Sequence, residues 1–437
     1  MIIADIEKMF RQIGICEADM PLQSILWRTD TKKEVETYEL ATVTYGTKPA
    51  PFLATRTLKQ LASDEYNRFP NASKALVDDV YMDDVITGTD TESDAIKLCA
   101  DLIKLADSGG FRLRKFASNS AAALREVKIE DLALPQTNEI NLDPDPSVKT
   151  LGLVWQPHKD YFRFNFTIEQ IAAKERLSKR KILSAIAMLF DPLGLVGAVT
   201  TSAKIFMQRL WRLQEDGKTL GWDHPVPIEV EEEWRSFHGQ LSILNNLKIQ
   251  RCAVLPEAVN MELHFFSDAS ERAYGACAYV KSIDKHGRSV VCLLAAKSKV
   301  APLKSQSIPR LELCGAFLSA ELSVKVREAL KLEIDMHFWT DSTCVLQWLK
   351  AIPATWSTFV ANRVAKIQTI TENCTWRHVP GLQNYYCLDQ RGPNLSPRVP
   401  GRSSGDSVEG GHTRPSFLAS SILSRNGAPQ GRLLQNS

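Results

Sequence analysis

Three apolar segments decide the fold: MELHFFSDAS (261–270), RAYGACAYV (272–280) and SVVCLLAAK (289–297). Each is typical of a strand because it is short, apolar and bounded by polar or glycine residues. Residues 309–330 then form an amphipathic pattern with a proline in the first turn, which predicts a helix. MHFWTDS (336–342) predicts a fourth strand, followed by another helix. The order β-β-β-α-β-α predicts a mixed α/β sheet.

Acidic residues fall at the ends of these predicted elements. Asp268 ends the first strand, Glu312 lies in the first turns of the helix, and Asp341 ends the fourth strand. Taken singly, Asp341 fits a helix N-cap and Glu312 fits a solvated surface acid. Three such acids within one small module favour a shared site instead.

A second acidic motif, Tyr81-Met82-Asp83-Asp84, lies between the apolar runs ALVDDV (75–80) and VITGT (85–89). This pattern predicts a hairpin with two acids at its tip, and the structural alternative is a turn that simply favours aspartate. Asp5 ends another short apolar run. Two-metal phosphoryl transfer needs carboxylates from different segments. Asp5 and Asp83 could supply that pair, with Asp84 supporting.

Outside these motifs, the first half of the chain mixes predicted strands and helices, and the middle of the chain is predicted to be helical. Residues 51–64 and 95–106 predict helices, residues 75–87 a β-rich run, and residues 131–147 a polar loop. KTLGLVWQ and YFRFNFTI predict a hairpin before a helical block from Thr167 to about Leu247. The basic run Lys174–Lys181 at its start fits either a solvated helix face or a phosphate-contacting one.

Composition limits the classes of protein. The 437 residues carry 53 Lys+Arg against 51 Asp+Glu and are 44% hydrophobic, which excludes a polycation and full-length disorder. Nine cysteines without a C-x-x-C argue for a reducing compartment and against a zinc knuckle. The N-terminus lacks a signal-peptide pattern, and Asp191-Pro192 interrupts the longest apolar stretch, so buried helices are favoured over a membrane span.

The N-terminal motifs, in their order, resemble the palm of reverse transcriptases: Asp5 and Phe10, the PAPFLA loop and helix, YMDD, and a glycine–lysine segment. The resemblance implies that Asp5 and Asp83 hold metal and that Asp84 completes the carboxylate set. It also implies further roles: Phe10 under the incoming sugar, Lys115 near the triphosphate, Gly46 to Pro51 beside the template, and Leu151 with Gly152 in the primer-gripping hairpin.

The C-terminal module resembles ribonuclease H. By that resemblance Asp268, Glu312 and Asp341 bind two Mg²⁺ (or Mn²⁺) ions, and His378 assists product release. Cys387 stands at the position of the family's fourth acid, and Asp389 lies two residues further on. We therefore include Asp389 among the candidate catalytic residues.

The connecting block, KRKILSAIAMLFDPLGLVGAVTTSAKIFMQRLW (179–211) with WDHPVP (222–227), resembles the BEL/Pao group of LTR retrotransposons. The implied fold is α/β (α+β). Its expected parts are a palm without fingers (1–130), a primer-grip hairpin with a helical thumb and connection (131–250), a ribonuclease H-like mixed-sheet domain (258–391) and a disordered tail (392–437).

The implied function is that of an RNA-directed DNA polymerase with ribonuclease H. Its expected partners are an RNA template, a DNA primer, the RNA–DNA hybrid and deoxynucleoside triphosphates, without a membrane. Lys179, Arg180 and Lys181 are expected to contact nucleic acid. The expected location is the cytoplasm, in the element's virus-like particle, with the nucleus as a second location. The alternative is a decayed remnant that lacks catalysis and at most binds nucleic acid.

Overall fold

The computed structural model describes residues 1–133, 147–150, 153–166, 176–215 and 217–381. The chain divides into two compact units between Tyr161 and Phe162. Among the helices within these ranges, none is both long enough and apolar enough to cross a membrane. The mixed α/β class predicted from the sequence is confirmed in both units. The predicted tail lies outside the described residues.

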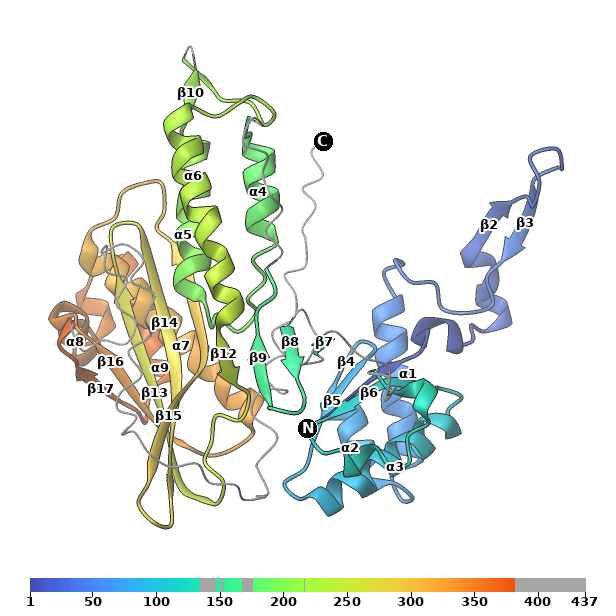
Figure 1. Cartoon of the computed structure of the whole chain (residues 1–437). Coiled ribbons are helices and arrows are strands. Elements are labelled where there is room, and N and C mark those ends of the chain that lie inside the picture. Colours follow the sequence, from blue (N-terminus) through green and yellow to red (C-terminus); the bar gives the residue numbers. More distant parts are fainter. Residues whose placement is uncertain (134–146, 151–152, 167–175, 216, 382–437) are drawn as a thin grey trace. The chain divides into compact units, whose positions relative to one another are not determined.

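A four-stranded antiparallel sheet forms the centre of the first unit (Figure 1). Its order is β4 (Val80–Tyr81), β5 (Asp84–Thr87), β1 (Ile2–Ile6) and β6 (Leu113–Ser118). The apolar side chains of β1 are buried. Strand β1 therefore lies inside the sheet and carries Asp5 at a fixed place beside β5.

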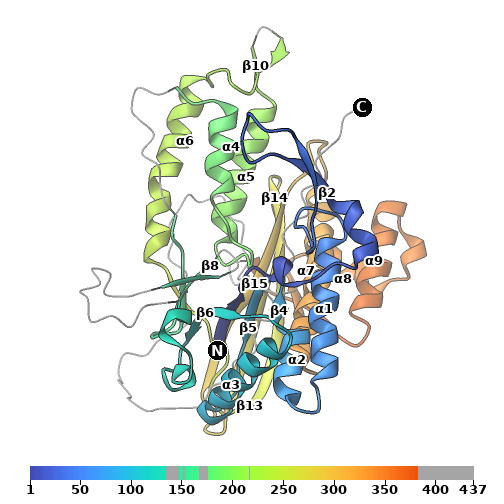
Figure 2. The same ribbon diagram turned by 90° about the vertical axis from the view of Figure 1, so that its right-hand side faces the viewer.

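Three helices pack with this sheet into one apolar core: α1 (Ala50–Asp64), α2 (Pro70–Asp78) and α3 (Glu92–Ser108) (Figure 2). The predictions for α1 and α3 are confirmed. The predicted β-rich run from residue 75 to residue 87 is wrong for its first residues, because α2 continues to Asp78, and it is confirmed for β4 and β5. Pro70 starts that helix, and Ala72, Ala75 and Leu76 recur at helical spacing and are buried.

The shorter elements of the first unit connect these parts. They are the 3₁₀ turns η1 (Met9–Gln12), η2 (Glu17–Gln23), η3 (Ala122–Leu124) and η4 (Ile129–Asp131), and the strands β2 (Ser24–Trp27), β3 (Glu36–Glu39), β7 (Val148–Thr150) and β8 (Leu153–Gln156). β2 pairs with β3, and β7 pairs with β8, each as an antiparallel hairpin.

The second unit begins with a helical block, as the sequence predicted. β9 (Tyr161–Arg163) spans the boundary between the units, and the elements after it are α4 (Lys179–Ala187), α5 (Gly197–Trp211), β10 (Gln214–Glu215), β11 (Lys218–Thr219), α6 (Ile228–Gln240), η5 (Leu241–Asn246) and β12 (Lys248–Gln250). The Asp191 carboxylate accepts hydrogen bonds from the backbone N–H groups of Leu195 and Val196 in the turn between α4 and α5. The long apolar stretch is therefore two helices joined by a turn.

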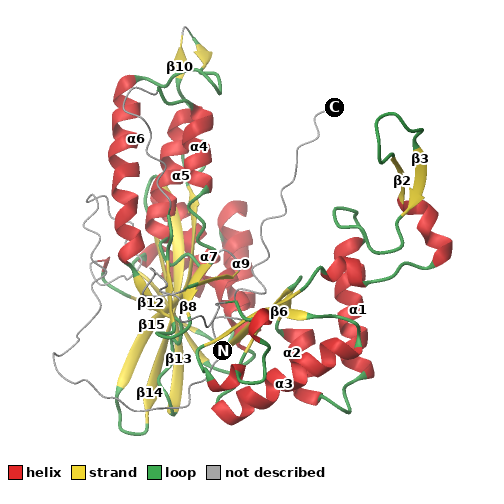
Figure 3. Cartoon of the chain, turned by 45° about the vertical axis from the view of Figure 1, so that its right-hand side comes forward, coloured by secondary structure: helices red, strands yellow, loops and turns green. Residues whose placement is uncertain are grey.

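A five-stranded mixed sheet follows, in the order β15-β14-β13-β16-β17 (Figure 3). The strands are β13 (Ala258–Ala269), β14 (Ala273–Asp284), β15 (Ser289–Val300), β16 (Asp335–Thr340) and β17 (Thr375–His378). β13, β14 and β15 are antiparallel, whereas β16 runs parallel to β13 and to β17. The helices are α7 (Ile308–Leu330), α8 (Thr343–Lys350) and α9 (Thr358–Ile370), with η6 (Pro353–Thr355).

Two candidate carboxylate sites

In the first unit, the antiparallel pairing of β1 with β5 places Asp5 directly opposite Asp84. Tyr81 pairs with Asp84 across the β4–β5 turn, in which Met82 adopts a left-handed conformation with φ of +56°. The backbone carbonyl of Asp83 accepts a hydrogen bond of 2.8 Å from the N–H of Ile6. The turn is thereby held against β1, which keeps the two carboxylates on neighbouring strands.

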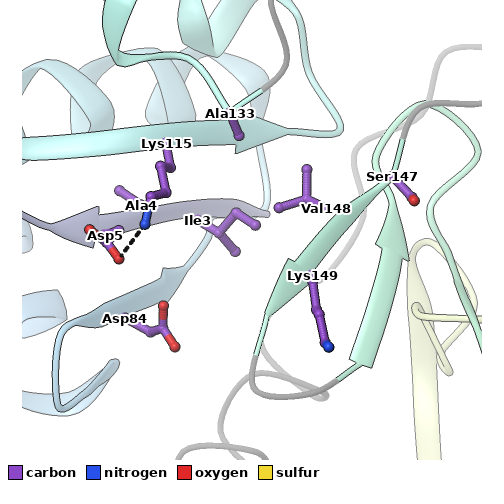
Figure 4. Close-up of a pocket in the computed structure, with 9 residues that line it drawn as sticks. All are labelled: Ile3, Ala4, Asp5, Asp84, Lys115, Ala133, Ser147, Val148 and Lys149. Carbon is purple, nitrogen blue, oxygen red and sulfur yellow. Dashed lines mark hydrogen bonds and ion pairs between the residues drawn. The ribbon is translucent and has the colours of Figure 1, made fainter. Parts of the chain in front are cut away.

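Lys115 adds a cation to this site. Its Nζ lies 3.1 Å from Oδ2 of Asp5 (Figure 4). Burial raises the pKa of Asp84 to about 6, and the negative charges of Asp83 and Asp5 add to this rise, while the charge of Lys115 opposes it. Asp84 therefore holds a proton more readily than an ordinary aspartate, and a bound cation would favour its ionised form.

A cavity of about 280 Å³ opens beside these side chains. It is lined by Asp5, Asp84 and Lys115 together with Ile3, Ala4, Ala133, Ser147, Val148 and Lys149 (Figure 4). The structure thus brings Asp5, Asp84 and Lys115 together, while Asp83 is exposed and does not line the cavity. Sequence reasoning missed Lys149 as a site residue, although this basic residue is the first of the KTLGLVWQ segment that was predicted to form the primer-grip hairpin.

The described residues Phe10, Gly46 and Pro51, also predicted for the palm, do not line this cavity. Phe10 belongs to η1 and packs half-buried against the core. Gly46 has φ of +89° in the loop before α1, a conformation that favours glycine, and Pro51 is exposed in the first turn of α1. The predicted primer-grip residues Leu151 and Gly152 lie outside the described residues.

In the second unit, the parallel pairing of β13 with β16 ends at Ser267 and Thr340. Asp268 comes next in β13, where it still pairs with Gly275 of β14, and Asp341 directly follows the end of β16, so both acids lie at the same end of the parallel pair. Gly315 of α7 faces this point, because a Cβ there would lie 3.0 Å from the backbone oxygen of Asp268. The missing side chain allows α7, which carries Glu312, to approach β13 closely.

Ser342 connects two of the elements at this end of the sheet. Its hydroxyl donates a hydrogen bond to Oε2 of Glu312 and accepts one of 3.2 Å from the N–H of Val345. Ser342 is therefore the N-cap of α8. The structural alternative for Asp341, an N-cap, is excluded by this finding.

Asp341 has a buried oxygen without a protein donor. Within the described residues, no hydrogen-bond donor reaches its Oδ1. Burial raises the pKa of Asp341, and the nearby His378 opposes that rise. Burial also raises the pKa of Glu312, and the charge of Asp341 adds to it, although the hydrogen bond from Ser342 works the other way. When both carboxylates of such a pair are ionised, a bound cation offsets their burial and mutual repulsion.

These carboxylates supply hard oxygen donors of the kind that Mg²⁺ and Mn²⁺ prefer. Oδ1 of Asp268 accepts a 2.7 Å hydrogen bond from the N–H of Ala269. Across the described part of the chain, however, no three His, Cys, Asp or Glu side chains already lie together as a metal-binding group. The carboxylate oxygens fit a divalent cation. Glu312 and Asp341 lie close enough for the charge of Asp341 to raise the pKa of Glu312.

His378 ends β17 and pairs with Thr340, the residue before Asp341. It is exposed, so its ring is accessible next to the carboxylates. Gly381 also approaches the site, since a Cβ there would lie 3.2 Å from Oδ2 of Asp341. The positions of Cys387 and Asp389 lie outside the described residues.

Part of the basic run at the start of the helical block forms contacts within that block. Arg180 forms two contacts with the Asp223 carboxylate, at 2.7 and 3.0 Å, and Lys179 is buried with its pKa lowered by that burial. Lys181 is exposed, and its Nζ donates to the backbone oxygen of Arg176 at 3.3 Å. Of the three predicted nucleic-acid contacts, Lys181 and Arg180 are accessible to a strand.

Part of the second unit matches a known protein family. Residues 178–342 match the model of the Pao retrotransposon-like RNaseH-like domain. No curated protein matches the chain. Among solved structures, the chain is similar to the foamy viral protease–reverse transcriptase in complex with dsDNA, at 14% identity over 86% of this chain and 67% of that chain, with a TM-score of 0.48. Residues 178–342, which the family model matches, include Asp268, Glu312 and Asp341. Residues 178–342 are therefore similar to the Pao retrotransposon-like RNaseH-like domain, and the resemblance to this group that the sequence motifs indicated is confirmed for that part of the chain.

Proposed function

We propose that the second unit hydrolyses the RNA strand of RNA–DNA hybrids. The observation that carries this proposal is the buried Oδ1 of Asp341, which no donor from the described residues reaches, beside Glu312 at the end of two parallel strands. A buried carboxylate oxygen without a donor costs free energy, and a bound cation would remove that cost. Asp268, at the same end of the sheet, completes the proposed carboxylate set.

The reaction is the attack of water on a phosphodiester, with the bond from phosphorus to the leaving 3′-oxygen broken. A pair of Mg²⁺ ions, when bound, lowers the pKa of the attacking water and stabilises the leaving oxygen. Asp268, Glu312 and Asp341 would hold these ions, and Ser342 orients Glu312 through its hydrogen bond. His378, exposed beside Asp341, would assist the release of the product.

The substrate is expected to be chosen by backbone geometry and 2′-hydroxyl contacts rather than by base sequence. The test uses an end-labelled RNA–DNA hybrid with Mg²⁺, the wild-type chain and the Asp268→Asn variant. Asp335→Asn is the matched control, because Asp335 is an exposed acid at the start of β16, away from the Asp341 end of that strand. We expect cleavage by the wild type and the control only.

Two outcomes would contradict the proposal. Equal cleavage by Asp268→Asn would assign the activity to another site or to a contaminant. Hybrid binding without any cleavage by a folded wild-type chain would favour the second reading, a remnant that only binds nucleic acid. Circular dichroism spectra of all three chains establish that they are folded.

A second candidate function, RNA-directed DNA synthesis, is supported by the cavity in the first unit. Asp5, Asp84 and Lys115 line it together, which is a suitable set for a metal-bound triphosphate. Deoxynucleoside triphosphates, an RNA template and a DNA primer are the proposed ligands. Primer extension that requires Asp5 and a divalent cation would support this function, and extension unchanged in Asp5→Asn would reject it.

The proposed working location is the cytoplasm, within the element's particle. All cysteines in the described ranges are free thiols, which supports a reducing compartment. Fractionation of cells that express the tagged chain tests the location, and a secreted product would contradict it.

A further inference from the structure

Arg310 of α7 and Arg363 of α9 share one aromatic ring, that of Phe359. The guanidinium carbon of Arg363 lies 3.6 Å from the centroid of this ring, and that of Arg310 lies 5.2 Å from it. The two cations are therefore no further apart than the sum of these distances. Phe359 is half-buried and packs against the apolar core that α7, α8 and α9 form, so the ring is a fixed support for both guanidiniums. We call these three side chains the arginine cluster.

Within the described residues, no carboxylate pairs with either arginine of the cluster. Arg363 is half-exposed, and its Nη1 donates a hydrogen bond of 3.0 Å to the backbone oxygen of Phe359, which fixes the guanidinium on the ring. Arg310 is exposed, and its guanidinium contacts the ring alone. Two like charges held close together repel each other, and an anion bound between them would offset that repulsion. The planar N–H donors of a guanidinium suit the oxygens of a phosphate group.

The arginine cluster lies at the same end of α7 as the proposed metal-holding acids. Arg310 belongs to the first turn of α7, two residues before Glu312. A further cation extends the row along α9: Lys366, one turn beyond Arg363, is exposed, and its Nζ lies 5.8 Å from the centroid of the Phe317 ring. A row of cations next to a site for phosphodiester hydrolysis fits the repeating phosphates of a nucleic-acid strand better than one small anion.

We propose that Arg310 and Arg363 bind one phosphate group of the RNA–DNA hybrid and thereby position the hybrid at the carboxylate site. This inference rests on the hydrolysis of hybrids proposed for the second unit. N–H groups of both guanidiniums donate to oxygens of the same phosphate, while Phe359 holds the two side chains in place. The contact is made to the backbone, so it carries no preference for base sequence. Both arginines are positioning residues, because they hold the substrate and take no part in the bond-breaking step.

Fluorescence anisotropy with a fluorescein-labelled RNA–DNA hybrid tests the arginine cluster apart from catalysis, since a chelator in the buffer prevents cleavage. Arg310→Gln and Arg363→Gln should each raise the Kd about five- to tenfold at low salt. Because the two side chains share one phosphate, the double variant should raise the Kd by much less than the product of the single effects. Arg327→Gln is the matched control, because it removes the same charge from an exposed arginine in the last turn of α7. The control should leave the Kd unchanged.

Two further measurements sharpen the binding test. The slope of log Kd against log salt should change by about one in the double variant, the value for one phosphate contact, and a change of about two would overturn the shared phosphate. Phe359→Leu keeps an apolar side chain and the net charge but removes the ring, so it should also raise the Kd. Circular dichroism establishes that each variant is folded. Tighter binding of poly-glutamate than of the hybrid, with the same dependence on Arg310, would assign the cluster to protein carboxylates and overturn the proposal.

Cleavage assays with Mg²⁺ separate this inference from the proposed function. In Arg310→Gln and Arg363→Gln we expect KM to rise while kcat stays nearly unchanged, as for residues that bind the substrate equally in the ground and transition states. Cleavage by both variants with unchanged Kd and KM would overturn the role of the cluster and leave the hydrolysis standing. A wild-type chain that never cleaves the hybrid, but binds it in the arginine-dependent way described, would reject the hydrolysis and support the phosphate contact.

Discussion

The two carboxylate sites differ in how the negative charge of their acids is balanced. In the first unit, Asp5 and Asp84 face each other on antiparallel strands, and Lys115 supplies a built-in cation at 3.1 Å from Asp5. In the second unit, Asp268 and Asp341 lie at the same end of two parallel strands, and no lysine or arginine pairs with Glu312 or Asp341 among the described residues. His378 is the group whose charge acts on Asp341.

This difference indicates how strongly each site depends on a bound cation. A lysine beside the acids balances part of their charge before any metal or substrate binds. Beside the acids of the second unit lie a serine hydroxyl, backbone N–H groups and a histidine, and no donor from the described residues reaches Oδ1 of Asp341. We therefore expect the second site to respond more strongly to a divalent cation than the first.

The largest expected effect separates the two sites. Asp341→Asn should lower hybrid cleavage by about 10²–10³-fold, because it removes a charge from the proposed metal-holding set, and should leave primer extension unchanged. Asp5→Asn should do the reverse. Both activities are measured on the same preparations, and a variant that lowers both equally would show that the two sites are not independent.

A smaller effect concerns stability. The folded-state pKa of Asp84, about 6, lies above its ordinary value, so the native state binds the proton more tightly than the unfolded state. The associated stabilisation is present at low pH and is lost as the pH rises through about 6. Removing the charge by Asp84→Asn should therefore stabilise the metal-free chain at pH 8 by about 1–2 kcal/mol, a value reduced for solvent screening.

Urea unfolding at pH 8 and pH 4 with a chelator present measures this effect. The gain should shrink toward zero at pH 4, where the wild-type residue is protonated in the native state. Asp107→Asn, an exposed acid at the end of α3, should change stability by less than about 0.5 kcal/mol at either pH. A pH-independent gain in Asp84→Asn would contradict the electrostatic explanation.

The close approach of α7 in the second unit gives the next effect. In Gly315→Ala, the new Cβ meets the backbone oxygen of Asp268 at 3.0 Å, so the helix or the strand must shift. We expect a loss of about 1 kcal/mol in unfolding free energy, with a decrease in hybrid cleavage. The matched control is Gly239→Ala in α6, where no atom lies within 4 Å of the added Cβ.

Gly239→Ala should instead raise stability by up to about 1 kcal/mol, because alanine is the better helix former. Thermal unfolding and cleavage assays on both variants check the pair. Stabilisation by both substitutions would mean that α7 and β13 have more room than the structure gives them.

The smallest expected effect concerns nucleic-acid affinity. Lys181→Glu reverses an exposed charge of the basic run and should weaken hybrid binding severalfold, with the salt slope reduced by about one. Lys97→Glu on α3, also exposed, is the control for net charge. Fluorescence anisotropy at several salt concentrations measures both, and identical slopes would remove Lys181 from the interface.

The sequence by itself determined β13, β14, β15, α7, β16 and α8 of the second unit and the order of its acids, but not α9 or β17. The apolar runs that became β13, β14, β15 and α7 are bounded by polar or proline residues, so local pattern was sufficient to predict them. Local pattern failed at α2, where the branched side chains of residues 75–80 suggested a strand. Burial of Ala72, Ala75 and Leu76 against the core favoured the helix instead.

The tertiary structure alone decided how the acids work together. Sequence order grouped Asp83 with Asp5, but strand register sets Asp84 opposite Asp5 and leaves Asp83 exposed at the turn. Likewise, only packing shows that Ser342 caps α8 and that Asp341 keeps a buried oxygen without a donor. The reason is physical: a residue's position along the chain sets its local conformation, whereas its burial, its charge neighbours and hence its pKa depend on contacts between distant segments.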